Sequence, residues 1–162
     1  FAAEVLRLCR AAGISTAVES NLTFPRAVLE KLTPQLDLLM ADIKHMDAQT
    51  HRAVVGQDNA RTLENLRWAD ELGLPLIVRT PVIPGFNDTP ENIRQTAEFL
   101  RGLKHLRYYE LLSYNPMGND KRRRLGYAVP EIAVPSKAQM LALAQEAARC
   151  ARPVWVDGRI RA

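Results

Sequence analysis

Four short apolar runs alternate along this chain with stretches of helical periodicity, and each run ends in polar side chains. The runs cover residues 14–18, 36–41, 76–78 and 106–112. Strict alternation of strands and helices predicts an α/β fold, in which right-handed crossovers join parallel strands. The carboxyl ends of such strands lie at one edge of the sheet, where ligand-binding groups collect. We therefore expect a site at that edge, in a sheet that forms a closed barrel or a curved part of one.

Periodicity and turn signals place helices between these runs. The run at 36–43 is almost continuously apolar, which is typical of a strand buried on both faces. Thr89-Pro90 and Ser136–Gln139 carry the start signals of two helices, the second as a capping box. Residues 113–135 predict a long polar loop. The remaining expected elements are helices over 1–12, 25–31 and 61–72 and a short last strand over 153–156.

The bulk properties indicate one ordinary globular domain over residues 1–162. The chain is 47% apolar, yet no apolar run approaches the roughly 20 residues that span a bilayer. We recognise no signal peptide, and therefore expect a cytoplasmic protein that binds neither membrane nor nucleic acid. Cys9 and Cys150 lie far apart and outside any CxxC or Cys/His cluster, which favours buried thiols over a metal site or disulfide.

The net charge of +4 owes much to four consecutive basic residues at 121–124. A short run of this kind is usually a solvated face. The alternative is a contact with a phosphate group or an acidic partner, which the charge permits but does not require.

Asp42 and Lys44 stand two residues apart at a strand end, so their side chains point to the same face. An acid that interrupts so apolar a strand is costly unless it is paired or binds a cation. A structural Asp–Lys pair and a ligand-binding role both remain open from these residues alone.

The other strand ends carry polar groups of different kinds. Glu19–Asn21 offers a carboxylate, a hydroxyl and an amide, although serine and asparagine are also common in turns. The planar guanidinium of Arg79 suits a ligand carboxylate, but it could equally pair with Asp42 or Glu19. Asn115 precedes a proline, and Asn-Pro is a common turn pair.

Taken in order, four segments resemble one family. They are AVESN at 17–21, MADIK at 40–44, VRTPVIPG at 78–85 and ELLSYNPMG at 110–118. This series resembles the glycyl-radical-enzyme activating enzymes of the pyruvate formate-lyase activating type, within the radical S-adenosylmethionine superfamily. The resemblance covers essentially the whole chain. It implies a partial (β/α) barrel of parallel strands that holds S-adenosylmethionine beside a [4Fe–4S] cluster.

The resemblance also implies roles for individual residues. Glu19, Ser20 and the adjacent Asn21 match positions at the methionine part of the cofactor and a nearby cation. The backbone carbonyl of Met40 and the side chain of Asp42 match a monovalent cation site. Further matches are Lys44 at the methionine carboxylate, Arg79 in the cofactor pocket, Asn115 beside adenine, and the loop around Lys121 near the partner's glycyl loop.

By the same resemblance, a complete enzyme would cleave S-adenosylmethionine reductively and generate a 5′-deoxyadenosyl radical. That radical would abstract hydrogen from a backbone glycine of a glycyl-radical enzyme. The electron donor would be flavodoxin or a ferredoxin-like protein, and the activating enzyme a monomer. The family's CxxxCxxC cluster motif and Gly-Gly-Glu stretch do not occur in this sequence. We therefore expect residues 1–162 to be the C-terminal portion of such a barrel, and inactive alone.

Two other functions are compatible with the residues. One is a non-catalytic module that binds a partner through the basic segment 113–135. The other is a (β/α) barrel enzyme that acts on a phosphorylated metabolite and uses Asp42 and Lys44.

Overall fold

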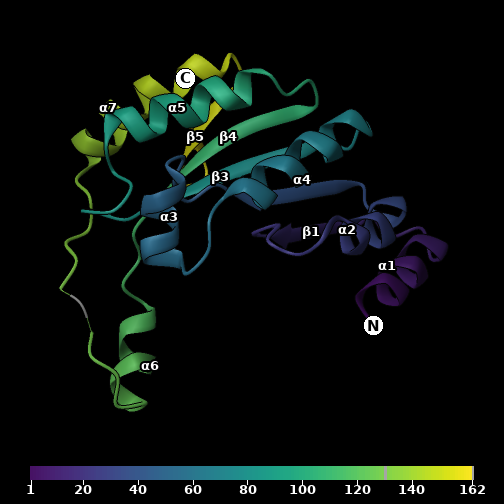
Figure 1. Cartoon of the computed structure of the whole chain (residues 1–162), viewed down its shortest axis with the longest axis horizontal. Helices are drawn as coiled ribbons and strands as arrows, with labels where there is room; N and C mark the ends of the chain where they lie inside the picture. The colour runs from purple at the N-terminus through teal and green to yellow at the C-terminus, as the bar shows by residue number, and fades with distance from the viewer. Residues whose placement is uncertain (130, 162) are drawn as a thin grey trace.

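The computed structural model describes residues 1–129 and 131–161, and its strands form one sheet (Figure 1). Strand order in the sheet equals strand order in the chain, from β1 to β6. The first five strands are parallel neighbours, and β6 is antiparallel to β5. The strands are β1 (Ala17–Ser20), β2 (Leu38–Asp42), β3 (Leu76–Val82), β4 (Leu106–Ser113), β5 (Val154–Val156) and β6 (Arg159–Ile160).

Helices connect the parallel strands, and α4, α5 and α7 lie along the outer side of the sheet (Figure 1). Two short 3-10 helices follow α2 and α7, at Thr33–Gln35 and Ala148–Cys150. The α-helices are α1 (Ala2–Ala11), α2 (Arg26–Leu32), α3 (Ala48–Val55), α4 (Ala60–Glu71), α5 (Pro90–Arg101), α6 (Gly118–Arg124) and α7 (Lys137–Ala147). The predicted α/β class and the parallel sheet are confirmed.

The core lies between the outer face of the sheet and the helices that cover it. Leu39 and Ala41 of β2 are fully buried there, as are Ile93, Ala97 and Leu100 of α5. These side chains recur every two residues in the strand and every three to four in the helix, so each element presents one apolar face to the other. The apolar stripe of α5 therefore packs into the core.

Helix starts follow their sequence signals closely. The Thr89 hydroxyl caps α5 by accepting from the backbone N–H of Asn92, and Pro90 occupies the first turn. Ser136 and Gln139 form the predicted capping box at the start of α7. Both devices satisfy backbone N–H groups that lack partners within the helix.

Two predictions about the strands were wrong. The expected strand at 14–18 begins only at Ala17, because Ile14 is exposed and the Thr16 hydroxyl donates to the Gln35 carbonyl. The strand around β2 is buried on only one face, since Met40 on the other face is half-buried. An apolar strand such as β2 can therefore have helices packed against only one of its two faces.

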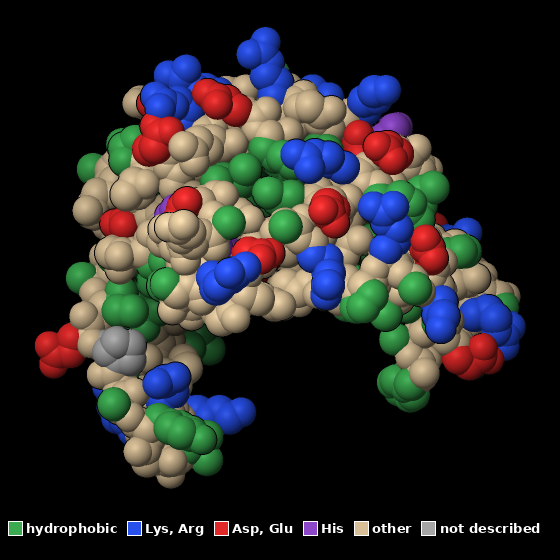
Figure 2. Space-filling model, in the orientation of Figure 1, with side chains coloured by type: hydrophobic (Ala, Val, Ile, Leu, Met, Phe, Trp, Pro, Cys, Tyr) green, Lys and Arg blue, Asp and Glu red, His purple; other side chains and the backbone are tan. Residues whose placement is uncertain are grey.

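The segment expected to be a loop, 113–135, contains helix α6. Figure 1 shows α6 hanging away from the sheet at the end of a long excursion. In the space-filling view the molecule is an arch, hollowed beneath the sheet between the α6 lobe and the α1 end (Figure 2). No helix among residues 1–129 and 131–161 combines the length and apolarity that crossing a bilayer requires.

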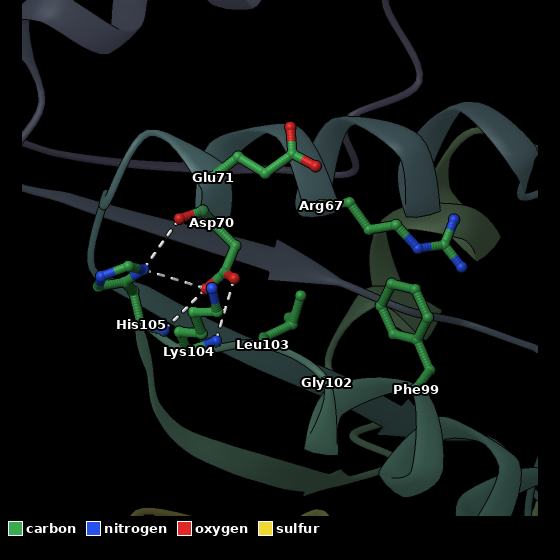
Figure 3. Close-up of a pocket in the computed structure, with 8 residues that line it drawn as sticks. All are labelled: Arg67, Asp70, Glu71, Phe99, Gly102, Leu103, Lys104 and His105. Carbon is green, nitrogen blue, oxygen red and sulfur yellow. Dashed lines mark hydrogen bonds and ion pairs between the residues drawn. The ribbon is translucent and has the colours of Figure 1, made fainter.

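At the amino-terminal edge of the sheet, Asp70 at the end of α4 fixes the turn that leads into β4 (Figure 3). Its carboxylate accepts from the backbone N–H groups of Lys104 at 3.0 Å and His105 at 2.7 Å. The side chain is only 9% exposed, so both N–H groups depend on it. The pocket in Figure 3 therefore contains a structural clamp.

We expect Asp70→Ala to lower the free energy of unfolding by about 1–3 kcal/mol, because two backbone donors lose their acceptor. Urea denaturation would measure the loss. Glu71→Ala is the matched control, since Glu71 is the neighbouring acid, is exposed, and makes no hydrogen bond in the described part of the chain. If the two substitutions lowered the free energy of unfolding equally, the bonds of Asp70 to Lys104 and His105 would not account for the loss.

Candidate functional site

Strand register aligns several functional side chains on the inner, concave face of the sheet. Glu19 is opposite Met40, and Asp42 is opposite Arg79. Arg79 is in turn opposite Glu110 of β4. Because paired residues of parallel neighbours point to the same face, these side chains share one surface near the carboxyl ends of the strands.

An ion-pair cluster forms where three of these elements meet. The guanidinium of Arg79 bonds Asp42 at 3.3 Å and also pairs with Glu19. Lys44 Nζ donates to the other oxygen of Asp42 at 3.1 Å. The structure thus brings together four of the predicted site residues, and it realises the internal pairing of Arg79 that the sequence left open.

The cluster is partly withdrawn from water. The side chains of Arg79 and Asp42 are 15% and 17% exposed, whereas that of Glu19 is 56% exposed. Burial alone would lower the pKa of Arg79, but the carboxylates of Glu19 and Asp42 outweigh it and leave that pKa above its ordinary value. Arg79 therefore remains a permanent cation.

One atom of the cluster lacks a partner. Arg79 Nε is buried and makes no hydrogen bond with any described residue. A buried N–H without an acceptor is unusual in proteins and calls for an explanation. A ligand carboxylate at the concave face would supply the missing acceptor, because guanidinium groups bind carboxylates through two parallel N–H donors.

The other predicted site residues lie outside this cluster. Ser20 is on the outer side of β1, opposite Ala41, and its hydroxyl accepts from the backbone N–H of Leu22. Asn21 is exposed and accepts from Thr23. Asn115 is exposed, and its Oδ1 accepts from the backbone N–H of Met117 at 3.0 Å. Each makes a local turn bond near a strand end and forms no hydrogen bond with the four charged side chains.

Buried asparagines hold the loops that carry the site, and sequence reasoning missed them. Asn87 is fully buried; its amide donates to the carbonyls of Lys44 at 2.7 Å and Pro81 at 2.8 Å, and its oxygen accepts from Ile83 N. Asn65 similarly donates to the carbonyls of Leu22 and Phe24 after β1. Asn59 and Asn92 bond the loop at 45–46 after β2. These amides replace the hydrogen bonds that irregular backbone lacks.

The concave face also carries residues of β4 and β5 that the sequence analysis did not single out. Tyr108 stacks on Trp155 with 4.6 Å between ring centroids. Glu110 is 8% exposed and accepts from the backbone N–H of Gly158 in the β5–β6 turn at 2.9 Å. Alternation along β4, which places Tyr108 and Glu110 on the face of Arg79, was the signal that could have found them.

Comparisons with known proteins identify the family of this chain. The family model of the radical SAM superfamily matches residues 1–100. The chain belongs to the radical SAM superfamily. A crystal structure of a domain of pyruvate-formate lyase-activating enzyme from Bacteroides vulgatus resembles this radical SAM chain with a TM-score of 0.80 and 27% identity. That match covers 96% of this chain and 89% of the other.

Curated relatives of this radical SAM chain are activating enzymes. The isethionate sulfite-lyase activating enzyme of Desulfovibrio desulfuricans is 42% identical over 80% of this chain and 42% of its own length. The pyruvate formate-lyase 2-activating enzyme of Escherichia coli is 35% identical over 98% of this chain and 54% of its own. The chain thus spans about half the length of these relatives. The resemblance to glycyl-radical-enzyme activating enzymes and the partial-barrel fold are confirmed.

Superfamily membership implies S-adenosylmethionine and a [4Fe–4S] cluster as cofactors. The charged cluster suits the first of these, because the methionine part carries both a carboxylate and an ammonium group. Arg79 and Lys44 can bind the carboxylate, and the exposed carboxylate of Glu19 can bind a cation. No described residues form a group of three or more His, Cys, Asp or Glu side chains that could hold a metal ion, so no cluster ligands are assigned.

Proposed function

We propose that this chain is the C-terminal part of a radical SAM oxidoreductase that activates a glycyl-radical enzyme. The observation that carries the proposal is the cluster of Glu19, Asp42, Lys44 and Arg79 at the carboxyl edge of a parallel sheet. The names of the curated relatives support the reaction class. When bound, S-adenosylmethionine and its iron–sulfur cluster supply the radical that removes hydrogen from a glycine of the partner.

In this proposal the chain's own residues bind and orient. Lys44 and Arg79 hold the methionine carboxylate, with Arg79 Nε gaining its missing acceptor. Asp42, with the Met40 carbonyl, holds a monovalent cation, and Glu19 and Asn21 border the methionine part. Asn115 borders the adenine. No side chain need transfer a proton, since the protein contributes positioning and exclusion of water.

The identity of the partner is a finer proposal. The relatives named above activate different enzymes, one an isethionate sulfite-lyase and one a pyruvate formate-lyase. We propose a glycyl-radical enzyme of the pyruvate formate-lyase type as partner, a flavodoxin or ferredoxin-like electron donor, a monomeric activating enzyme and a cytoplasmic location.

Anaerobic reconstitution tests the proposal. The complete protein, loaded with iron and sulfide and reduced with dithionite, is expected to convert S-adenosylmethionine to methionine and 5′-deoxyadenosine. Electron paramagnetic resonance would then detect a glycyl radical on added pyruvate formate-lyase. The 162-residue chain alone is the control and should cleave no cofactor, because it has only two cysteines. A cluster-loaded complete protein that leaves S-adenosylmethionine intact would disprove the proposed function.

A further inference from the structure

The positive charge of this chain is concentrated in its last third. Residues 113–162 contain nine lysines and arginines and four acids. Residues 1–112 contain 13 lysines and arginines and 14 acids. The first part is therefore nearly neutral, and the last part carries the whole excess. Figure 2 shows lysine and arginine side chains gathered on the lobe that α6 forms.

Much of this charge lies on the excursion between β4 and α7, described over residues 114–129 and 131–135, which we call the arm. None of its described residues is buried, and α6 within it is exposed except for the half-buried Asn119. Ordering so long a segment costs conformational entropy that burial of apolar surface normally offsets. Excursions of this length are uncommon in compact domains, and they are usually either functional or linker segments.

The arm combines cations with exposed apolar side chains. Lys121 and Arg124 make no ion pair with any described residue, while Arg123 bonds Asp120 and Arg122 lies over Tyr127. The exposed large apolar members are Met117, Leu125, Tyr127 and Val134, which are 82%, 61%, 62% and 55% exposed. Arginine, methionine and aromatic residues are the types enriched in protein–protein interfaces.

A pocket at the root of the arm continues the same surface. Ser113 and Pro135, where the arm leaves and rejoins the body, both line it. Its lining includes three apolar residues, Met140, Leu141 and Val156. Three of its lining residues are cations, Lys137, Arg159 and Arg161, and one, Asp157, is an acid that bonds Ser113. In the described part of the chain the side chains of the three cations have no hydrogen-bond or ion-pair partner.

We propose that the arm and this root pocket together form a docking surface for an acidic, partly apolar segment of the macromolecular partner. The inference rests on the proposed function, because it assumes a protein partner. Charge complementarity selects an acidic segment, and the exposed apolar side chains of the arm favour protein over nucleic acid. The surface adjoins the cofactor site, since the same β5–β6 turn donates to Glu110 on the concave face and binds Ser113 through Asp157.

Fluorescence anisotropy on the complete protein tests this surface. The probes are a labelled peptide of glutamate and leucine, the same peptide with glutamine for glutamate, and a labelled single-stranded oligonucleotide. We expect the acidic peptide to bind, with affinity falling as salt rises. The variants Lys121→Glu/Arg124→Glu and Lys137→Ala/Arg159→Ala should each weaken binding at least about tenfold.

Arg101→Glu/Arg107→Glu is the matched control, because both arginines are exposed and lie on α5 and β4, away from the arm. Circular dichroism checks that each variant folds. Equal binding by the glutamine peptide, tighter binding of the oligonucleotide, or equal losses in the control would each overturn the docking surface. Cofactor cleavage by the wild-type protein without peptide reports on the proposed function alone, so the two failures are distinguishable.

Discussion

Replacing Arg79 with alanine is expected to weaken S-adenosylmethionine binding to the complete protein by at least about tenfold. Charge-assisted hydrogen bonds to a carboxylate contribute about 1.5–3 kcal/mol, and tenfold in affinity corresponds to 1.4 kcal/mol. The substitution removes the cation that contacts both Glu19 and Asp42 and carries the unpartnered Nε. Isothermal titration calorimetry measures the affinity without any need for turnover.

The same substitution should also lower the free energy of unfolding, by about 1–3 kcal/mol, because Asp42 stays largely buried with only Lys44 beside it. Arg79→Lys keeps the charge but loses the planar donor pair, so its affinity should fall between those of wild type and Arg79→Ala. Arg101→Ala, on the exposed side of α5, is the matched control. Unchanged cofactor affinity in Arg79→Ala would remove Arg79 from the proposed site.

Replacing Asn87 with alanine is expected to cost about 3 kcal/mol of the free energy of unfolding. The fully buried amide satisfies two carbonyls and one N–H, and each group left without a partner costs about 1–3 kcal/mol. Because one of those carbonyls belongs to Lys44, the loop that presents this cation should loosen. Hydrogen exchange would detect faster opening of residues 43–47.

Asn87→Asp is the sharper test of the same bonds. It keeps the size and the acceptor for Ile83 N, but turns an acceptor toward the carbonyls of Lys44 and Pro81, so it should destabilise at least as much as alanine. Asn115→Ala serves as control, since that exposed amide makes one local bond and should change stability by less than about 0.5 kcal/mol. If the Asn87 variants were as stable as the wild type, the hydrogen bonds of Asn87 would not be needed to stabilise the loop after β2.

Much of the fold could be predicted because its signals are local. Thr89 and Ser136 start helices through bonds to residues three positions away, and short apolar runs mark β3 and β4. The pairing of Asp42 with Lys44 could be predicted for the same reason, because the two residues are close in sequence. The cofactor-binding roles of the residues at the four strand ends stay predictions. Asn115, for example, makes a local turn bond with Met117 in this structure.

What escaped prediction depends on distant parts of the chain. The composition of 84–88 predicts a turn, but not that Asn87 reaches a carbonyl 43 residues away. Helix α6 has four adjacent cations and no apolar stripe, so the sequence there lacks the hydrophobic periodicity that would predict a helix. The apolar residues of β2 look alike on both faces, and only the arrangement of the helices decides which face is covered.

The sequential order of the strands has a consequence for biosynthesis. Each parallel strand pairs with the one that precedes it in the chain, from β1 to β5. Among the strands that the structure describes, none has to insert between two that have already paired, so this sheet can lengthen one strand at a time as the chain leaves the ribosome. Parallel pairing is slow when loops must close over long separations. Here each closure spans only one connection, which shortens the time that an unpaired edge is exposed to aggregation.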